Sequence, residues 1–239
     1  MIILPAIDIK DGKCVRLHQG KKEEETVYAE DPTPVALKWQ NKGAQYLHIV
    51  DLDAAFEGRL VNFDVIRNMT MDLTIPFQYA GGLRSLESIE RSLSLGADRV
   101  VIGTVACESE DFLENIIKEF KQRIAVAIDV REGVVSVKGW TQDTGIEPIY
   151  LAKQVEKMGG SMIVYTDILS DGAMKGPNFK GVEMLLDAIK VPVIVSGGIS
   201  SVEDVKKIKK IEYKGVAGVI IGKALYTGDI KLEQVLYKS

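Results

Sequence analysis

The chain opens on the stretch Ile2-Ile3-Leu4-Pro5-Ala6-Ile7-Asp8-Ile9-Lys10-Asp11-Gly12, an apolar run that ends in a carboxylate, a charged pair and a glycine. The same pattern returns near the middle of the chain as Ile124-Ala125-Val126-Ala127-Ile128-Asp129-Val130-Arg131-Glu132-Gly133. An apolar run of this length, bounded by turn residues, is typical of a strand buried on both faces. Each copy therefore predicts a buried strand that carries an aspartate, Asp8 or Asp129, to its C-terminal end.

Short apolar runs of this kind alternate with amphipathic segments along the whole chain. The alternation predicts parallel strands covered by helices, and eight such units in 239 residues fit a (β/α)8 barrel. An open, doubly wound sheet is the alternative, although the glycine fingerprint that such folds carry after their first strand is missing. The expected strands are Ile2–Ile7, Tyr46–Val50, Leu73–Tyr79, Arg99–Ile102, Ile124–Ile128, Met162–Tyr165, Val191–Val195 and Val216–Ile221.

The segments between these runs carry helix signals. Ser85, Ser109 and Asn178 each precede an amphipathic run, and Ser200-Ser201-Val202-Glu203 is interpreted as a capping box. Gly43, Gly96 and Gly159 stand between a helical run and the next strand, where a glycine commonly ends a helix. Residues 11–31 are expected to form a long solvated loop, Val134–Lys138 a short β excursion, and Leu232–Tyr237 the last helix.

The two halves of the chain repeat each other beyond the opening stretch. Gly81-Gly82-Leu83-Arg84-Ser85 matches Gly197-Gly198-Ile199-Ser200-Ser201, and Val101-Ile102-Gly103 matches Ile220-Ile221-Gly222, in the same order and at nearly constant spacing. This predicts a duplicated half-barrel, with halves of roughly 1–122 and 123–239 in one domain that spans 1–239. Each chemical device should therefore occur twice, on opposite sides of the barrel mouth.

Composition excludes several classes of protein. The formal net charge is −4, with 30 basic and 34 acidic residues well mixed, which argues against a partner that is a nucleic acid or a membrane surface. The sequence has neither a signal segment nor an apolar run of transmembrane length, so we expect a cytoplasmic protein that acts as a monomer. Cys14 and Cys107 lack metal-site spacing and predict two reduced thiols.

Paired glycines after the third and seventh expected strands indicate anion sites. Glycine lets the backbone approach an anion closely, and the N-terminus of the helix that follows supplies N–H donors. The next strand of each half also ends in glycine, and in barrels the loops after the last two strands commonly bind phosphate. Two facing sites predict a substrate with a phosphate at each end, although either turn alone could be a tight connection without a ligand. The residues concerned are Gly81, Gly82, Gly103, Thr104, Gly197, Gly198, Gly222 and Lys223.

The second chemical feature that the repeat predicts is a pair of carboxylates. Asp8 and Asp129 lie on the first and fifth strands, so the barrel places them across the mouth from each other. Two carboxylates in different environments can serve as base and acid, whereas an aspartate that only caps its own loop is the structural alternative. Asp51 and Asp167 also end strands, and Thr166 could hydrogen-bond an acid or a substrate hydroxyl.

Other polar side chains carry weaker signals. His48 alternates with apolar neighbours and is interpreted as an interior histidine more readily than as a catalytic one. Trp140 follows Gly139 in a long loop, where it could either pack or stack on a planar base. Three arginines that the sequence does not rank, Arg16, Arg84 and Arg131, are candidates to reach a phosphate or a carboxylate.

These residues resemble a known family, the isomerases of histidine biosynthesis that act on the ribonucleotide ProFAR (phosphoribosylformimino-5-aminoimidazole carboxamide ribotide). The likeness spans the whole chain. The matching stretches are Pro5-Ala6-Ile7-Asp8, His48-Ile49-Val50-Asp51-Leu52-Asp53, Gly81-Gly82-Leu83-Arg84-Ser85, Val101-Ile102-Gly103-Thr104, Ala127-Ile128-Asp129, Lys138-Gly139-Trp140, Tyr165-Thr166-Asp167, Asp171-Gly172, Gly176-Pro177-Asn178 and Ser196-Gly197-Gly198-Ile199.

The resemblance implies a (β/α)8 barrel, a bisphosphorylated ribonucleotide substrate and an Amadori rearrangement of an aminoaldose to an aminoketose. It assigns Asp8 as general base and Asp129 as general acid, assisted by Thr166, without a cofactor or a metal. The substrate-binding and phosphate-binding residues that it indicates are Gly81, Gly82, Arg84, Gly103, Thr104, Trp140, Asp171, Gly172, Gly176, Ser196, Gly197, Gly198, Gly222 and Lys223.

The chain departs from the family pattern at Ala80, where many members have glycine, and at Ala173, where many have threonine. Three alternatives stay open. The sister cyclase of the pathway shares the duplicated barrel, but its first strand usually reads Pro-Cys-Leu-Asp where this one has Pro5-Ala6-Ile7-Asp8. A dual isomerase would also accept phosphoribosylanthranilate. A non-catalytic barrel would only bind a bisphosphorylated ligand.

Overall fold

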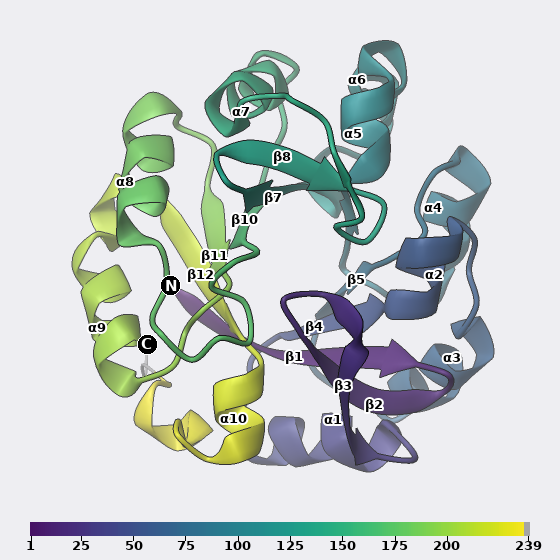
Figure 1. Ribbon diagram of the computed structural model, residues 1–239. Coiled ribbons are helices and arrows are strands. Elements are labelled where there is room, and N and C mark those ends of the chain that lie inside the picture. The colour runs from purple at the N-terminus through teal and green to yellow at the C-terminus, as the bar shows by residue number, and fades with distance from the viewer. Residues whose placement is uncertain (237–239) are drawn as a thin grey trace.

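The computed structural model describes residues 1–236, and in it eight parallel strands close into a barrel (Figure 1). β12 pairs with β1 and β10 pairs with β7, so the order of strands has no free edge, which excludes the open sheet. The predicted (β/α)8 barrel is therefore confirmed. Its strands are β1 (Ile2–Lys10), β4 (Leu47–Asp51), β5 (Phe77–Ala80), β6 (Arg99–Ile102), β7 (Ile124–Arg131), β10 (Ile163–Asp167), β11 (Val193–Ser196) and β12 (Val216–Ile221).

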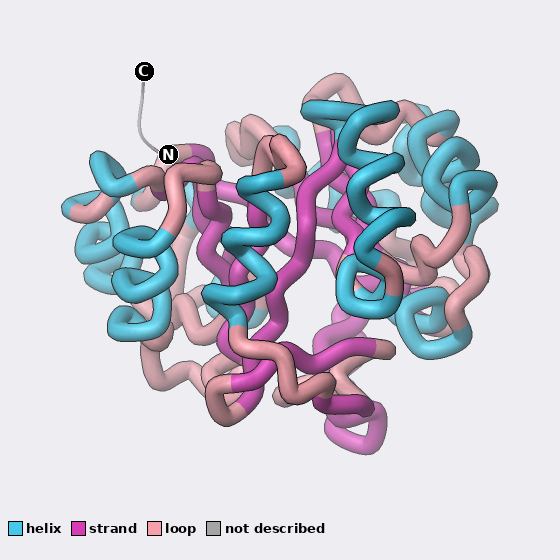
Figure 2. Tube along the Cα trace, turned by 90° about the horizontal axis from the view of Figure 1, so that it is seen from above, coloured by secondary structure: helices cyan, strands magenta, loops and turns pink. Residues whose placement is uncertain are grey.

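Helices surround the strands as an outer ring, as Figures 1 and 2 both show. They are α1 (Thr33–Asn41), α3 (Phe63–Met71), α4 (Leu86–Ser94), α6 (Glu110–Phe120), α7 (Pro148–Lys157), α8 (Phe179–Ala188), α9 (Val202–Lys210) and α10 (Lys223–Thr227). Two further short helices, α2 (Leu52–Glu57) and α5 (Thr104–Glu108), follow β4 and β6 directly. Short 3-10 turns complete the described chain at Lys121–Arg123, Glu212–Lys214 and Leu232–Gln234.

The apolar core has two layers because each strand alternates its side chains between the helices and the barrel interior. Outward residues such as Ile7, Ile49 and Ile128 pack against the helix ring. Inward residues fill the barrel itself, and they are Leu4, Ala6, Tyr46, Val101, Ala125, Val164, Ile194 and Ile220. A filled interior leaves the C-terminal end of the barrel as the place for a site.

The predicted helix signals are largely confirmed. The side chains of Ser85, Ser109 and Asn178 accept hydrogen bonds from the first turns of α4, α6 and α8. The capping box predicted at Ser200-Ser201-Val202-Glu203 lies one residue later, because Ser201 is the N-cap and Asp204 its partner. Four expected strands also begin later than predicted. The two larger differences fall after Pro76 and Pro192, since proline offers no N–H to a neighbouring strand.

Two segments differ from the expectation. Residues 11–31 are not a loop, because most of them form the antiparallel strands β2 (Lys13–His18) and β3 (Lys21–Ala29), with β2 paired to β1. Charged residues on β3 hide its strand pattern in the sequence. The expected helix Leu232–Tyr237 is only a 3-10 turn over Leu232–Gln234, and Tyr237 lies outside the described residues.

The second half of the chain has a hairpin at the same place as the β1–β2 hairpin of the first half, directly after its first barrel strand. β7 turns back into β8 (Val134–Val137), which pairs with β9 (Gln142–Asp143), so the predicted β excursion is confirmed. In Figure 2, strand segments project beyond the barrel at the end away from the N-terminus, where the C-terminal ends of the parallel strands lie. Within residues 1–236, no helix has the length and apolarity to cross a membrane.

Candidate active site

A cavity opens at the C-terminal ends of the barrel strands, and nearly every residue predicted for the site lines it. The structure brings together Asp8, Asp129, Thr166, Gly81, Gly82, Arg84, Gly103, Thr104, Trp140, Asp171, Gly172, Ser196, Gly197, Gly198, Gly222 and Lys223. The exception is Gly176, which is not among the lining residues. Its carbonyl oxygen lies behind Gly198, only 2.5 Å from where a Cβ on that glycine would be.

Asp8 stands at one side of the cavity with a buried cation beside it. Arg16 on β2 donates a hydrogen bond from Nη1 to Asp8 Oδ2 over 2.7 Å, and both side chains are nearly inaccessible to solvent. Burial raises the pKa of Asp8 to about 6, while the Arg16 guanidinium works against that rise. The charge of Arg16 therefore favours the ionised form of this carboxyl group.

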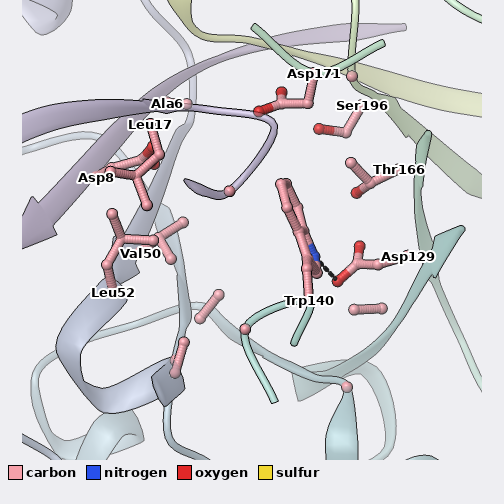
Figure 3. A pocket seen from close by; sticks show the side chains of 18 of the residues that line it. Ala6, Asp8, Leu17, Val50, Leu52, Asp129, Trp140, Thr166, Asp171 and Ser196 are labelled. Atoms are coloured by element: carbon pink, nitrogen blue, oxygen red, sulfur yellow. Dashed lines mark hydrogen bonds between the residues drawn. The ribbon is translucent and has the colours of Figure 1, made fainter. Parts of the chain in front are cut away.

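Asp129 stands on the other side with only neutral donors. Trp140 donates from Nε1 to Asp129 Oδ2 over 2.8 Å, and Figure 3 shows the indole ring standing between the two carboxylates. Burial raises the pKa of Asp129 to about 6, and hydrogen bonds from Trp140 and Thr166 oppose the rise. The sequence repeat makes Asp8 and Asp129 equivalent, whereas their surroundings differ in charge.

A third carboxylate, Asp171, faces the same space (Figure 3). Its Oδ1 lies 3.7 Å from Arg16 Nη2, so one guanidinium serves two carboxylates. Burial raises the pKa of Asp171, against the influence of Arg16, His18 and Lys223. The neighbouring Gly172 carbonyl accepts a hydrogen bond from Lys223 Nζ over 3.0 Å.

The glycine turns need glycine for a steric reason. A Cβ on Gly81 would lie 2.2 Å from the carbonyl oxygen of Asp51, and one on Gly197 would lie 2.5 Å from that of Asp167. Both glycines also have positive φ angles, 114° and 87°, which side chains rarely adopt. The turns therefore press their backbone against the end of the preceding strand in both halves. Each leads into a serine-capped helix, α4 or α9.

Asp51 and Asp167 lie behind these turns and outside the cavity lining. Asp51 is fully buried and accepts hydrogen bonds from the backbone of Ala54, Val61 and Asn62 and from the Asn62 side chain. Asp167 accepts from the Ser170 backbone and the Asn178 side chain. The two carboxylates therefore hold loops in place, which is the structural interpretation of an aspartate at a strand end.

Each half of the barrel contributes one cavity-lining cation that is in no ion pair of the described chain, but from a different position in each half. Arg84 follows the first turn directly and donates to the carbonyl of Ala55, whereas the matching position after the second turn is Ser200. The second turn has instead Lys223, after β12, where the first half has Thr104. Among the ion pairs within residues 1–236, none includes Arg84 or Lys223. Both positive charges are therefore available to a bound anion.

Several lining residues carry no signal, or only a weak one, in the sequence. Arg16 is unranked because residues 11–31 are predicted as a loop, whereas its contact with Asp8 depends on the pairing of β2 with β1. His48 is expected in the interior, and it does lie there, but it also reaches the cavity. Arg131 is not among the lining residues. The apolar wall includes Leu17, Val50, Leu52, Phe56, Met174 and Ile199, and of these Leu17, Phe56 and Met174 lie outside every motif.

No group of three or more histidine, cysteine, aspartate or glutamate side chains in the described chain is arranged to hold a metal ion. The groups that line the cavity are buried carboxylates, a guanidinium and backbone amides. Such a set can move protons on a small anionic substrate.

Comparison with known proteins now identifies the family. Residues 2–231 match the model of the family described as histidine biosynthesis protein. A relative from Synechocystis sp. is 48% identical over 236 residues, which cover 99% of this chain and 92% of the relative. Relatives from Thermodesulfovibrio yellowstonii and Thermoanaerobacter pseudethanolicus are 48% and 43% identical, each over 99% of this chain and 96% or 98% of their own.

The chain belongs to this family of histidine-biosynthesis isomerases. All three relatives carry the name 1-(5-phosphoribosyl)-5-((5-phosphoribosylamino)methylideneamino)imidazole-4-carboxamide isomerase. Membership of the family makes this chain an isomerase, and the near-complete coverage extends to both halves of the barrel. The resemblance that the sequence motifs indicated is thereby confirmed.

Proposed function

We propose that this isomerase converts ProFAR, the aminoaldose after which its relatives are named, to the corresponding aminoketose. The observation that carries the proposal is the pair of glycine turns, each with one cation outside any ion pair of the described chain, on opposite halves of one cavity. The relatives' name contains two phosphoribosyl groups, and a substrate of that kind has a phosphate at each end. Arg84 supports one phosphate and Lys223 the other, together with the backbone amides of the turns.

The reaction needs one acid and one base, and the two buried aspartates supply them. The acid protonates the ring oxygen of the ribose that carries the amino group, and the ring opens to a protonated Schiff base. The base then removes the proton at C2′, and the resulting enolamine rearranges to the ketone. Atoms and electrons balance without an external oxidant, so aspartates alone can carry every proton.

The surroundings of the two carboxylates support distinct roles. Asp8 has the Arg16 guanidinium at 2.7 Å, which favours a carboxylate ready to accept a proton. Asp129 has the neutral donors Trp140 and Thr166 and no cation within ion-pair distance in the described chain. We assign Asp8 as the base and Asp129 as the acid, with Thr166 and Trp140 orienting the acid. The protein acts as a monomer in this proposal, without a nucleic acid or membrane partner.

Turnover of purified protein tests the proposal. Wild-type protein should convert ProFAR without an added cofactor, and Asp8→Asn and Asp129→Asn should each lower kcat by about 100- to 10,000-fold. Asp143→Asn is the control, because Asp143 is exposed in the second hairpin and outside the cavity lining. Normal turnover in both aspartate variants would refute the assigned roles. Assaying phosphoribosylanthranilate in parallel separates a single isomerase from a dual one, and absence of turnover on both indicates a binding protein.

A further inference from the structure

A buried polar chain runs through the barrel beneath the two carboxylates. The strand register places His48 on β4 opposite Gln78 on β5, and Gln78 opposite Arg99 on β6. All three side chains point into the barrel, where Gln78 is fully buried and His48 is 8% exposed. Arg99 begins β6 at the closed end of the barrel, and His48 lines the cavity at the other end.

Hydrogen bonds give this chain a direction. Arg99 donates from Nε and Nη2 to Gln78 Oε1, over 3.2 Å and 2.7 Å. A guanidinium has no acceptor, so the Gln78 oxygen must face Arg99 and its amide nitrogen must face His48. That nitrogen lies 2.8 Å from His48 Nδ1. Because the Gln78 amide can only donate at this point, Nδ1 accepts and carries no hydrogen.

The remaining proton of the imidazole must then sit on Nε2. Burial, helped by the nearby Arg16 and Arg99, lowers the pKa of His48 to about 3, so the ring is neutral at physiological pH. Within residues 1–236, Nε2 has no hydrogen-bond partner, and Gln78 on the Nδ1 side is not part of the cavity lining. Nε2 is not among the buried side-chain atoms that lack a partner in the described chain, so this nitrogen is accessible from the cavity, where a ligand can reach its hydrogen.

We propose that Arg99 and Gln78 are positioning residues that hold His48 in its Nε2–H tautomer, and that His48 donates this hydrogen to a sugar oxygen of the substrate. The inference rests on the proposed function, because that function puts a sugar between the two phosphate sites. A fixed neutral donor suits this place, because the ring is buried close to the positive charges of Arg16 and Arg99, which disfavour an imidazolium. His48 transfers no proton in this proposal, and Asp129 stays the acid.

The tautomer can be observed directly because the chain has only two histidines, His18 and His48. Protein labelled with ring-¹⁵N histidine should show one imidazole with a protonated Nε2 and a bare Nδ1, unchanged between about pH 5 and pH 8. His18→Gln assigns the two signals. A bare Nε2 on His48, or an imidazolium at pH 7, would overturn the proposal before any substrate is added.

Gln78→Glu then tests the hydrogen-bonded chain from Arg99 through Gln78 to His48, with little change of side-chain volume. A glutamate accepts from both Arg99 and His48, so the imidazole should carry a hydrogen on Nδ1, either as the other tautomer or as an imidazolium. We expect this change in the ¹⁵N spectrum together with a loss in kcat on the order of 10- to 100-fold and a KM within a few-fold. A changed spectrum with unchanged kcat and KM would refute the donor role.

Variants of His48 itself keep the test decisive if Gln78→Glu does not fold. The amide nitrogen of a glutamine lies close to the place of Nε2, so His48→Gln should retain much more activity than His48→Leu. Equal activities of these two variants would contradict the donor role. Turnover of ProFAR by the wild type tests the proposed function separately, because the wild-type spectrum needs no substrate.

Discussion

Arg16 Nη1 lies 2.7 Å from Asp8 Oδ2, and no equivalent cation accompanies Asp129 within the described residues. The two hairpins, β1–β2 and β7–β8, explain the difference. In the first hairpin, Val15 is the register partner of Asp8, and the next residue is the charged Arg16. In the second hairpin, Val135 is the register partner of Val130, and the next residues, Ser136 and Val137, are uncharged. The sequence repeat thus keeps both carboxylates, and the fold gives only one of them a buried positive charge, which separates their chemistry.

Replacing Arg16 should move the acid limb of the pH–rate profile. Arg16 lowers the pKa of Asp8 against the larger effect of burial, so in Arg16→Met the pKa of Asp8 should rise above about 6. A base must be deprotonated, and kcat/KM should therefore begin to fall at a higher pH than in the wild type. Profiles of log kcat/KM against pH between about 5 and 9 give the shift.

Arg84→Met provides the matched control for that experiment. Arg84 also lines the cavity, but it contacts the Ala55 carbonyl and has no part in the surroundings of Asp8. It should raise KM and leave the acid limb in place. An acid limb that moves equally in both variants would show that Arg16 has no specific effect on Asp8.

Asp129→Asn should stabilise the fold at neutral pH. Burial raises the pKa of Asp129 from 3.8 to about 6, so a charge on this group destabilises the folded protein above pH 6, and this cost fades as the pH falls toward 4. An asparagine oxygen can still accept from Trp140. We expect a gain in the free energy of unfolding of about 1–2 kcal/mol at pH 7 and almost none at pH 4. The gain at pH 7 is smaller than the full pKa shift implies, because the Asp129 side chain is partly accessible to solvent.

Thermal or urea unfolding at the two pH values measures this gain. Asp51→Asn is the contrasting variant, because Asp51 accepts five hydrogen bonds, one of them from the Tyr79 hydroxyl, and an amide nitrogen would face at least one of these donors. It should be less stable than the wild type. A destabilised Asp129→Asn at pH 7 would contradict the cost assigned to the buried charge.

Gly81→Ala should weaken substrate binding and leave the rest of the fold largely unchanged. Its Cβ would meet the Asp51 carbonyl oxygen at 2.2 Å, so the turn must move away from the strand end. We expect KM to rise by about 10-fold or more, since each lost hydrogen bond to a charged phosphate contributes about 1.5–3 kcal/mol. Steady-state kinetics with ProFAR gives KM and kcat separately.

Gly96→Ala is the control that separates the effect of backbone strain from the effect of the steric contact at Gly81. Gly96 also has a positive φ, 88°, but a Cβ there meets nothing within 4 Å. It should cost about 1–2 kcal/mol of stability and leave KM unchanged. The assignment of the first phosphate site would fail if the two variants raised KM alike.

Asn62→Ala should affect catalysis, whereas its counterpart Asn178→Ala should not. The Asn62 side chain donates to Asp51 and Asp53 and accepts from the backbone N–H of Gly12, and thereby ties the tip of the β1–β2 hairpin to the neighbouring loop. That hairpin carries both Asp8 and Arg16. Loss of this tie should lower kcat/KM and shift its acid limb, because the guanidinium is then less firmly held.

The Asn178 side chain caps a helix and has no hydrogen bond to either hairpin of the described chain. Its side chain donates to Asp167 and accepts from the Gly181 backbone, which caps α8. Removing it should cost about 1 kcal/mol of stability, as the loss of a helix cap does, with the acid limb unmoved. Equal pH profiles in the two alanine variants would exclude a special role for Asn62.

Several parts of the site could be predicted because they depend on strand order alone. Parallel strands in a barrel all end at the same mouth, so Asp8, Asp129 and the glycine turns had to converge once eight strands were recognised. Arg16 could not be placed because β3 carries Lys21-Lys22-Glu23-Glu24-Glu25, which has no apolar alternation. His48 has the pattern of a core residue, and only the path from Arg99 through Gln78 shows which of its nitrogens is occupied.

The sequence by itself determined the barrel, its repeat and the positions of both carboxylates, because apolar periodicity and turn residues act locally along the chain. The tertiary structure alone decided how those carboxylates differ. Arg16 reaches Asp8 across the first hairpin, and Trp140 reaches Asp129 from the loop that follows β8. Burial and the charge of neighbours set a pKa through space, and a symmetric sequence pattern carries no information about either.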